Sequence, residues 1–167
     1  KNPYGKSKIM SEKMLQDVNK TNKDFKYIIF RYFNVAGADL EGRIGQSTPN
    51  ATHLIKVCAQ AALRKRDAVY IFGDDYDTPD GTGIRDYIHV EDLADAHIKA
   101  LKYLENNDSD IFNCGYGQGY SVKEVIDMMK NVSGVDFKTI ITQIRPGDSA
   151  KAVANNEKIQ KMMTWKP

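Results

Sequence analysis

A tyrosine and a lysine four positions apart, Tyr4 and Lys8, stand near the start of this sequence of 167 residues. In a helix this spacing puts both side chains on one face, where the Lys8 ammonium can stabilise the ionised phenol of Tyr4. A phenol held in this way can serve as a general base. The same spacing is also common in ordinary surface pairs, so the surrounding sequence has to decide between the two interpretations.

Further along the chain, other side chains suit a sugar nucleotide. Asn34 follows a nearly continuous apolar run, which is typical of a buried parallel strand, and open α/β sheets bind ligands at the carboxyl ends of such strands. Arg85 and Arg145 carry planar donor forks that fit a diphosphate. Tyr70 and Phe72 share one face of a short expected strand and could flank a planar base. The plainer alternatives are that Asn34 is a turn residue, that the two arginines are surface charges, and that the two aromatic rings pack in the core.

The elements that must position these side chains alternate between helix and strand. Asn2 can cap a first helix that has Pro3 in its first position and continues to about Val18. We expect strands at 27–33, 69–72, 85–90, 111–114 and 137–142. We expect further helices after 91, after 121 and at 157–163, and one that begins at 54 and ends at the basic triplet Arg64-Lys65-Arg66, whose charge suits the negative end of the helix dipole. We expect loops at 36–52 and 73–83 and an irregular segment at 145–156. This order is typical of a doubly wound α/β sheet.

Two of the expected helices carry more detailed signals. Ser121 and Glu124 have the spacing of a capping box, which predicts a helix start. The helix after 91 should bury the following residues: Leu93, His97, Ala100, Leu101 and Leu104.

Composition excludes several classes of function. Lys and Arg number 24 against 22 Asp and Glu, and both signs are dispersed, so no charged surface for nucleic acid or membrane is expected. Cys58 and Cys114 are far apart and lack metal-site spacing, which predicts buried free thiols and no metal. With no apolar run near the roughly 18 residues of a membrane span and no signal sequence, we expect a cytoplasmic protein.

Longer motifs connect these observations. They are the segment 2–8, Arg31-Tyr32-Phe33-Asn34 with Val35-Ala36-Gly37, Phe72-Gly73-x-Asp75-Tyr76, the segment 80–90 and Asp92-Leu93-Ala94. Over essentially the whole chain, the sequence resembles the UDP-glucose 4-epimerases, in the extended branch of the short-chain dehydrogenase/reductase superfamily. The chain looks like the C-terminal part of such a protein, beginning just upstream of its catalytic tyrosine.

The resemblance implies NAD as cofactor and a UDP-sugar as substrate. It implies that Tyr4 is the base and that Lys8 binds the nicotinamide ribose, with Tyr32 and Phe33 beside the cofactor. It assigns the sugar nucleotide to ten positions: Asn34, His53, Leu54, Tyr70, Phe72, Arg85, Tyr87, Arg145, Asp148 and Ala152. The implied reaction is epimerisation at C4 of UDP-glucose and UDP-galactose through a 4-keto intermediate.

The resemblance also implies a domain organisation. Residues 1–35 and 86–115 would be the remainder of a Rossmann-like NAD-binding domain, and residues 36–85 and 116–167 would form a small α/β domain for the sugar nucleotide. Because the glycine-rich NAD loop is absent from this sequence, the chain is expected to be inactive alone. As in similar proteins, a homodimer is expected to pair through the first helix, where Met10 and Met14 could supply apolar contacts.

Ala152 bears on substrate range. In similar proteins a bulky residue at this position restricts the enzyme to plain hexoses, so alanine predicts that UDP-N-acetylglucosamine is also accepted. Two other functions remain open: a dehydratase or reductase of the same branch, and a non-catalytic protein that binds sugar nucleotides. An acidic pair in the region before Tyr4 would favour a dehydratase, and bound NAD without turnover would favour the non-catalytic protein.

Overall fold

The computed structural model describes residues 3–167, so the proposed cap Asn2 lies outside the described residues. Its elements are α1 (Pro3–Thr21), β1 (Ile28–Tyr32), β2 (Asn34–Ala36), α2 (Leu54–Ala62), β3 (Val69–Phe72), β4 (Ile84–His89), α3 (Val90–Asn106), β5 (Asp110–Cys114), β6 (Gly119–Ser121), α4 (Val122–Ser133), β7 (Thr139–Thr142), β8 (Lys151–Ala152) and α5 (Glu157–Met163). Strands pair in parallel as β1 with β5, β2 with β4 and β3 with β7. The expected mixed α/β fold with parallel sheets is confirmed.

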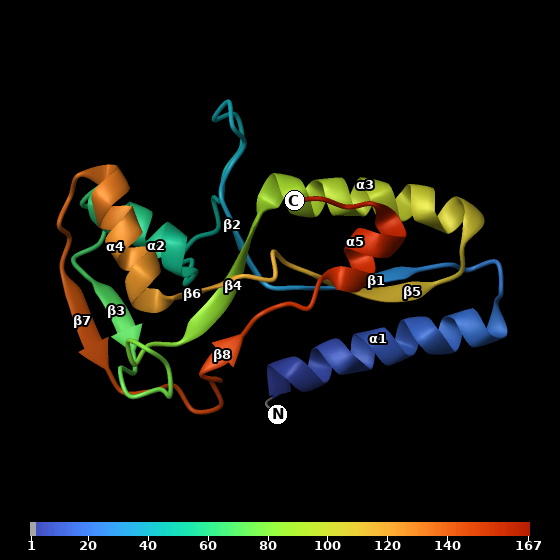
Figure 1. Ribbon diagram of the computed structural model, residues 1–167, viewed down its shortest axis with the longest axis horizontal. Helices are drawn as coiled ribbons and strands as arrows, with labels where there is room; N and C mark the ends of the chain where they lie inside the picture. The colour runs from blue at the N-terminus through green and yellow to red at the C-terminus, as the bar shows by residue number, and fades with distance from the viewer. Residues whose placement is uncertain (1–2) are drawn as a thin grey trace.

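Buried apolar side chains form two separate clusters. The first core joins β4, α3, β5 and α5 and consists of Ile88, Leu93, Ala96, Ala100, Phe112, Cys114, Ile159, Met163 and Trp165. The second core joins α2, β3, α4 and the residues before β7 and consists of Val57, Cys58, Ala61, Val69, Ile71, Ile126 and Phe137. Figure 1 shows β4 running between the two groups of elements. This strand therefore connects the two cores.

The C-terminal segment closes the first core. Ile159 and Met163 of α5 are buried there, and the Trp165 indole Nε1 donates a hydrogen bond of 3.1 Å to the Asp92 carbonyl at the start of α3. Sequence analysis had grouped residues 116–167 with the sugar-nucleotide domain. Ile159, Met163 and Trp165 pack beside α3 and β5, and the proposed domain division stays a prediction.

Local sequence signals explain how α4 begins. The Ser121 hydroxyl accepts from the Glu124 N–H, and the Glu124 carboxylate accepts from the Ser121 N–H, so the predicted capping box is confirmed. Ser121 also hydrogen-bonds to Asp80, which accepts two further bonds from the backbone N–H and hydroxyl of Thr82. Burial alone would raise the pKa of Asp80, but the hydrogen bonds from Ser121 and Thr82 lower it. The loop before β4 is thereby fixed to the start of α4.

Two details of α3 differ from the sequence prediction. His97 and Leu101 were expected to be buried, but both are exposed, Leu101 with a relative exposure of 66%. The buried stripe runs instead through Leu93, Ala96 and Ala100. A helical repeat of 3.6 residues places the stripe through 93, 97 and 101 beside the stripe through 93, 96 and 100, and apolar residues occur on both. His97 still packs edge-on against Phe30, with ring centroids 4.9 Å apart.

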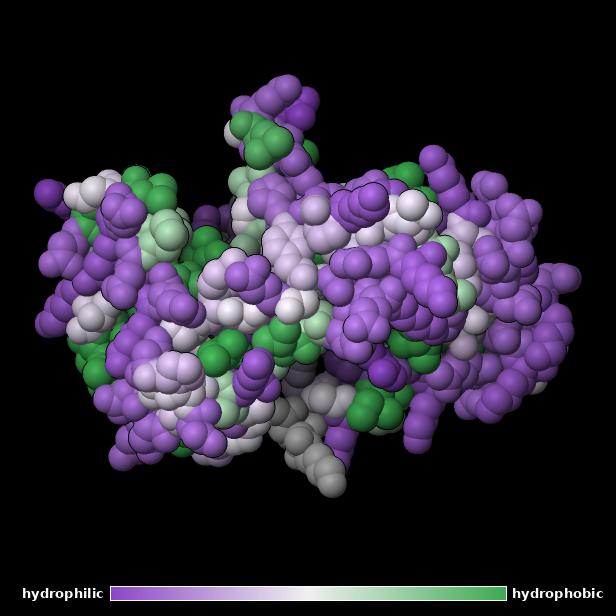
Figure 2. Space-filling model, viewed as in Figure 1, coloured by the Kyte–Doolittle hydropathy of each residue, from purple (hydrophilic) through white to green (hydrophobic). Residues whose placement is uncertain are grey.

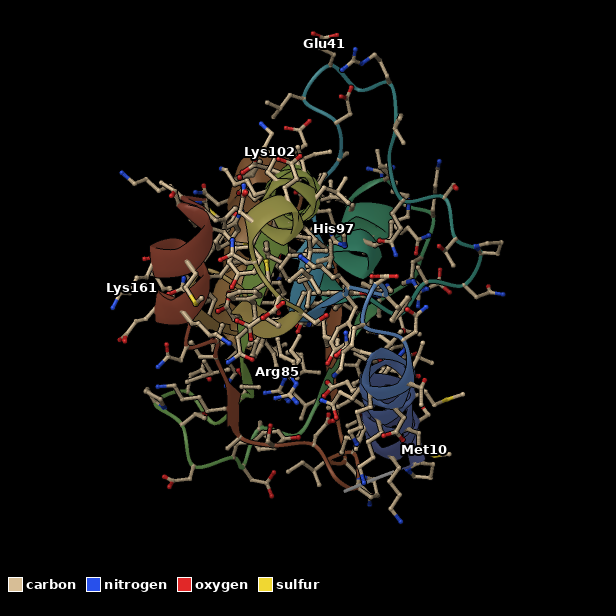
Figure 3. The ribbon with its side chains drawn as sticks, turned by 90° about the vertical axis from the view of Figure 1, so that its right-hand side faces the viewer. Met10, Glu41, Arg85, His97, Lys102 and Lys161 are labelled. Carbon is tan, nitrogen blue, oxygen red and sulfur yellow. The ribbon has the colours of Figure 1, made fainter. Side chains whose placement is uncertain are left out.

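Helix α1 is attached without burying any residue. The Arg31 guanidinium of β1 donates two hydrogen bonds to the Glu12 carboxylate, at 2.8 and 2.6 Å, and the Asn19 amide donates to the Phe25 carbonyl at 2.7 Å. Met10 lies on the outer side of this helix, whereas Glu41 marks the tip of a loop that projects from the opposite end of the molecule (Figure 3). Polar contacts therefore set the position of α1 relative to β1.

Much of the face shown in Figure 2 is hydrophilic, with hydrophobic side chains in scattered patches. Within residues 3–167, no helix combines the length and apolar character needed to cross a membrane.

Candidate active site

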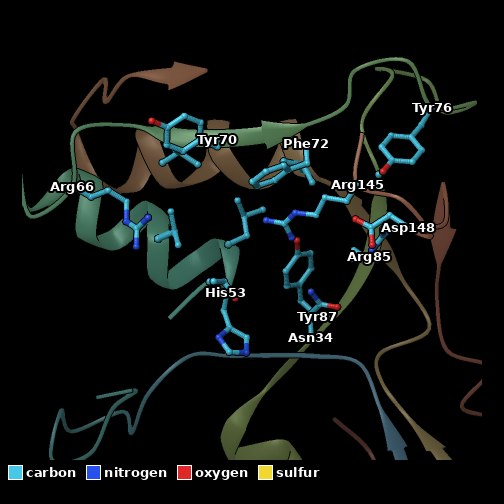
Figure 4. A pocket seen from close by; sticks show the side chains of 16 residues that line it. Asn34, His53, Arg66, Tyr70, Phe72, Tyr76, Arg85, Tyr87, Arg145 and Asp148 are labelled. Atoms are coloured by element: carbon cyan, nitrogen blue, oxygen red, sulfur yellow. The ribbon is translucent and has the colours of Figure 1, made fainter. Parts of the chain in front are cut away.

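A cavity of about 390 Å³ lies between α2, β3, the start of β2 and β4. This volume is within the range of small-molecule sites. The cavity collects side chains from segments that are far apart in the sequence, as Figure 4 shows. Nine of the ten positions assigned to the sugar nucleotide line it: Asn34, His53, Leu54, Tyr70, Phe72, Arg85, Tyr87, Arg145 and Asp148.

The tenth position, Ala152, does not line this cavity. It lies in β8, where it is the register partner of Arg85 across the parallel β4–β8 pair. Ala152 is partly buried beside the strand that carries Arg85. Because register partners on neighbouring strands project to the same face of a sheet, Ala152 lies beside Arg85, adjacent to one of the expected diphosphate contacts.

Asn34 and Tyr87 are paired across the β2–β4 ladder, and both face the cavity. Burial raises the pKa of Tyr87 to about 12, against the opposing effect of the nearby Arg85 charge. The Tyr87 phenol consequently remains protonated and can donate a hydrogen bond throughout the neutral range. Together with the Asn34 amide it provides both donors and acceptors on this wall.

Arg85 is held close to its own strand. Its Nη1 donates a 2.8 Å hydrogen bond to the Ile84 carbonyl, and the guanidinium packs against Gly83. A Cβ at Gly83 would come within 3.1 Å of that Nη1, so glycine at this position leaves room for the arginine side chain. The guanidinium is thereby directed along the cavity wall.

Asp86, the next residue of β4, is fully buried and organises the strand from behind. Its carboxylate accepts hydrogen bonds from the backbone N–H groups of Tyr116 at 2.9 Å, Gly117 at 2.9 Å and Ala154 at 3.1 Å. A Cβ at Gly115 would lie 2.7 Å from Asp86 Oδ2, so the turn can approach the carboxylate because residue 115 is glycine. Asp86 thus ties three chain segments together directly behind Arg85.

The cavity lining is positively charged overall. Three arginines, Arg66, Arg85 and Arg145, line the cavity together with a single carboxylate, Asp148. This excess of positive charge suits a ligand that carries more than one negative charge. Burial raises the pKa of Tyr76, and the Asp148 charge adds to the effect, so Tyr76 remains a neutral donor. The Arg145 guanidinium carbon lies 3.5 Å from the centroid of the Phe72 ring, in cation–π contact.

At the entrance of α2, His53 occupies the N-cap position without a side-chain cap. Its Nδ1 lies 2.9 Å from the Gln46 side-chain nitrogen, which fixes the ring away from the helix N–H groups. The first backbone N–H groups of α2, including that of Leu54, have no side-chain cap within this part of the structure. This arrangement suits an anion near the start of the helix.

Tyr4 and Lys8 lie on one face of α1, as the spacing predicted, and the Lys8 ammonium lies 5.2 Å from the centroid of the Tyr4 ring. Tyr4 has a relative exposure of 72% and Tyr32 is exposed as well. Neither residue lines the cavity, and neither does Phe33, although Phe33 precedes Asn34 directly. The residues assigned to the cofactor are therefore accessible and separate from the cavity.

The sequence motifs did not assign three polar residues of the cavity, Thr52, Tyr76 and Arg66. Tyr76 belongs to the motif that begins at Phe72, so its position next to Asp75 was the available signal. Arg66 was interpreted only as a charge at the end of a helix, yet α2 ends at Ala62. Its position three residues before the β3 strand that carries Tyr70 could have indicated a role in the cavity.

The remaining reactive groups lie elsewhere. Cys58 and Cys114 are buried free thiols, as expected, and burial raises their pKa values to about 11 and about 12. Among residues 3–167, no group of three or more His, Cys, Asp or Glu side chains is placed to hold a metal ion.

Comparison with known proteins identifies relatives of the chain. The model of the NAD dependent epimerase/dehydratase family matches residues 1–115. The UDP-glucose 4-epimerase of Azospirillum brasilense is 52% identical, over 99% of this chain and 48% of its own length. The UDP-glucose 4-epimerase of Rhizobium meliloti is 46% identical, over 99% of this chain and 51% of its own length. The chain therefore spans about half the length of the curated relatives it matches.

Solved structures give the same result. The UDP-Glc/GlcNAc 4-epimerase from Campylobacter jejuni is 54% identical, with a TM-score of 0.79, and covers all of this chain and 51% of its own. The UDP-glucose 4-epimerase from Bifidobacterium longum, in complex with NAD+ and UDP, is 39% identical with a TM-score of 0.93, over 99% of this chain and 50% of its own. The resemblance inferred from the sequence motifs is confirmed.

Proposed function

The chain belongs to the NAD dependent epimerase/dehydratase family, and from that premise we propose that it carries the substrate site of a UDP-glucose 4-epimerase. The observation that carries the proposal is the cavity, which gathers nine of the expected substrate residues and a positively charged lining around one space. Relatives of 46% and 52% identity, which are named UDP-glucose 4-epimerases, support it. The proposed reaction interconverts UDP-glucose and UDP-galactose.

In this reaction Tyr4 takes the proton from the sugar 4-hydroxyl, and Lys8 keeps a positive charge beside the phenolic ring. The sugar passes through a 4-keto form, which turns over so that its opposite face is presented. Arg85 and Arg145 hold the diphosphate during this rotation, because the anchored end of the substrate has to remain bound while the sugar turns.

The residues proposed for NAD fit such a cofactor. Tyr4 and Tyr32 are exposed, and the Lys8 side chain is accessible beside Tyr4, so aromatic surface and a donor-only ammonium are available to a nicotinamide ribose. Lys8 would donate to the ribose hydroxyls, and Tyr32 and Phe33 would flank the cofactor. When bound, NAD supplies the acceptor and donor of hydride for sugar C4.

We also propose that the N-acetylated substrate is accepted. Ala152 is the register partner of Arg85 and places only a methyl group beside that part of the wall. The relative from Campylobacter jejuni, which is 54% identical, is named as acting on both UDP-Glc and UDP-GlcNAc.

Pairing of two copies through α1 is part of the proposal. Met10 and Met14 are exposed on this helix, which buries none of its residues within the chain. Analytical ultracentrifugation of the native protein tests it, since a Met14→Glu variant should shift a dimer toward monomer.

The decisive test of the reaction is Tyr4→Phe in the native protein. The change removes the phenolic oxygen and keeps the ring, so turnover of UDP-galactose should fall by at least the roughly 10²–10⁴-fold typical of general-base loss. Affinity for UDP, measured by calorimetry, should be unchanged because Tyr4 does not line the cavity. Near-normal epimerisation by the variant would contradict the assignment of Tyr4 as the base.

A further inference from the structure

Arg66 lies at the end of the cavity opposite the other two arginines. Figure 4 shows it beside Tyr70, whereas Arg85, Arg145 and Asp148 gather at the far end beyond Phe72. Its guanidinium extends from the connection between α2 and β3 toward the interior of the cavity. The proposed diphosphate contacts leave Arg66 without a function.

The Arg66 guanidinium has N–H donors available for a ligand. Its Nε donates a 3.3 Å hydrogen bond to the Gln60 side-chain oxygen, which holds the plane of the group in place. No carboxylate of residues 3–167 forms a salt bridge with Arg66. A partly buried arginine with free donors in a ligand-sized cavity is suited to acceptor atoms of a ligand.

The order of side chains along the cavity suggests which ligand atoms these are. With a diphosphate at Arg85 and Arg145, the nucleoside extends along Phe72 and Tyr70, and the edge of the base farthest from the ribose arrives near Arg66. In a pyrimidine nucleotide that edge is the substituent at C4. It is a carbonyl oxygen, an acceptor, in uracil and an amino group, a donor, in cytosine.

We propose that Arg66 is a specificity-determining residue that reads the C4 substituent of the pyrimidine and thereby selects uridine over cytidine nucleotides. The inference rests on the proposed function, since it takes the cavity to be the nucleotide site. An arginine has no acceptor, so it pairs with the uracil oxygen and leaves the cytosine amino group facing another donor. A site that forms a hydrogen bond with one ligand binds an analogue that cannot form this bond much more weakly.

The neighbouring residues provide a matched control. Arg64 and Lys65 belong to the same basic segment but are exposed and do not line the cavity. Arg64→Met removes the same charge, by the same substitution, two residues from Arg66→Met. Any general electrostatic attraction of a diphosphate should therefore change similarly in both variants.

The experiment is calorimetry of UDP and CDP binding to the native protein, Arg66→Met, Arg66→Lys and Arg64→Met. We expect Arg66→Met to weaken UDP by about ten- to a hundredfold, the range for a hydrogen bond from a charged donor, and to change CDP little. The preference for UDP should therefore collapse. Arg66→Lys keeps the charge and one set of donors, so it should restore part of the preference, and Arg64→Met should leave it unchanged.

Other outcomes separate this inference from the proposed function. If Arg66→Met weakens UDP and CDP equally, or leaves UDP binding intact while Arg85→Ala reduces it, Arg66 does not read the base, although the cavity still binds nucleotide. If the native protein binds neither nucleotide, the proposed function itself fails. A lower melting temperature for Arg66→Met with an unchanged UDP-to-CDP ratio would assign the Gln60 contact a structural role only.

Discussion

Arg85 and Asp86 are adjacent in β4 but have different surroundings, because successive residues of a strand project to opposite faces. Arg85 faces the cavity, whereas Asp86 is fully buried and accepts three backbone hydrogen bonds from segments 116–117 and 154. The buried carboxylate holds the strand, and the strand in turn aims the guanidinium. A ligand contact of this kind depends on its neighbour as much as on its own side chain.

The two arginines at the diphosphate end give the first prediction. Arg85→Ala and Arg145→Ala should each weaken UDP binding by about 1.5–3 kcal/mol, because each removes a charged hydrogen bond. Calorimetry with UDP measures the change, and Arg64→Met serves as the control for net charge. Unchanged affinity in both alanine variants would exclude the cavity as the diphosphate site.

Ala152 gives a prediction about substrate range. Ala152→Tyr introduces a large side chain next to Arg85 and should overpack the wall on that side. Turnover of UDP-N-acetylglucosamine should fall while turnover of UDP-glucose is retained, and comparing kcat/KM for the two sugars measures the change. Ala152→Ser, a small residue, is the matched control. If the unchanged protein turns over UDP-glucose but not the N-acetyl sugar, the pocket is not open.

Among the elements, α1 depends most on polar contacts. It carries the proposed base but buries none of its residues, and Glu12 and Arg31 fix it to β1. The hydrogen bond from Arg31 lowers the pKa of Glu12 below its usual value of 4.5. Because the folded pKa is depressed, the contribution of this ion pair to stability is complete above about pH 4.5 and is lost as the pH falls through the lowered pKa.

Glu12→Gln tests this attachment. Because Arg31 is more than half exposed, the variant should lower the free energy of unfolding at pH 7 by no more than about 1 kcal/mol. Thermal melts of both proteins from pH 7 to pH 3 should converge as the wild-type carboxylate is protonated. A difference that persists at the lowest pH would show that Glu12 acts through packing rather than through its charge.

The elements also show what sequence could predict. The capping box at Ser121 and the parallel strand β1 follow from local rules, and both are present, although only Ile29 of β1 is buried, whereas the apolar run predicted a strand covered on both faces. His97 and Leu101 were assigned to the buried face of α3 because apolar residues occur on two adjacent stripes, and only tertiary packing selects between them. Arg66 was missed because its position in the cavity depends on how α2 and β3 meet, and its place three residues before β3 was the only signal in the sequence.

At the scale of the whole molecule, the cavity joins the two cores. Val57 and Val69 of the second core line it from one side, and Asn34 and Tyr87, paired beside the first core, line it from the other. Ligand binding therefore adds contacts to both groups of elements at once. Between them, β4 provides covalent continuity and pairs with β2, β6 and β8.

This arrangement predicts a shared stabilisation by ligand. At a UDP concentration of about one hundred times Kd, the free energy of unfolding should rise by about 2.7 kcal/mol. Amide hydrogen exchange should slow in both β3 and β4 when UDP is added. The reference is the same protein in buffer without UDP. Protection confined to one of the two strands would show that the ligand contacts only one core.

The contact between Arg145 and Phe72 has a kinetic consequence. The guanidinium carbon lies 3.5 Å from the ring centroid. Arg145, which is proposed to bind the diphosphate, therefore covers a ring face that a nucleotide base would use. A base can stack on this face only after the Arg145 side chain has moved off the ring. In stopped-flow mixing, the observed association rate should then level off at high UDP concentration, and Arg145→Ala should make it rise linearly, since the occupied ring face is cleared in advance.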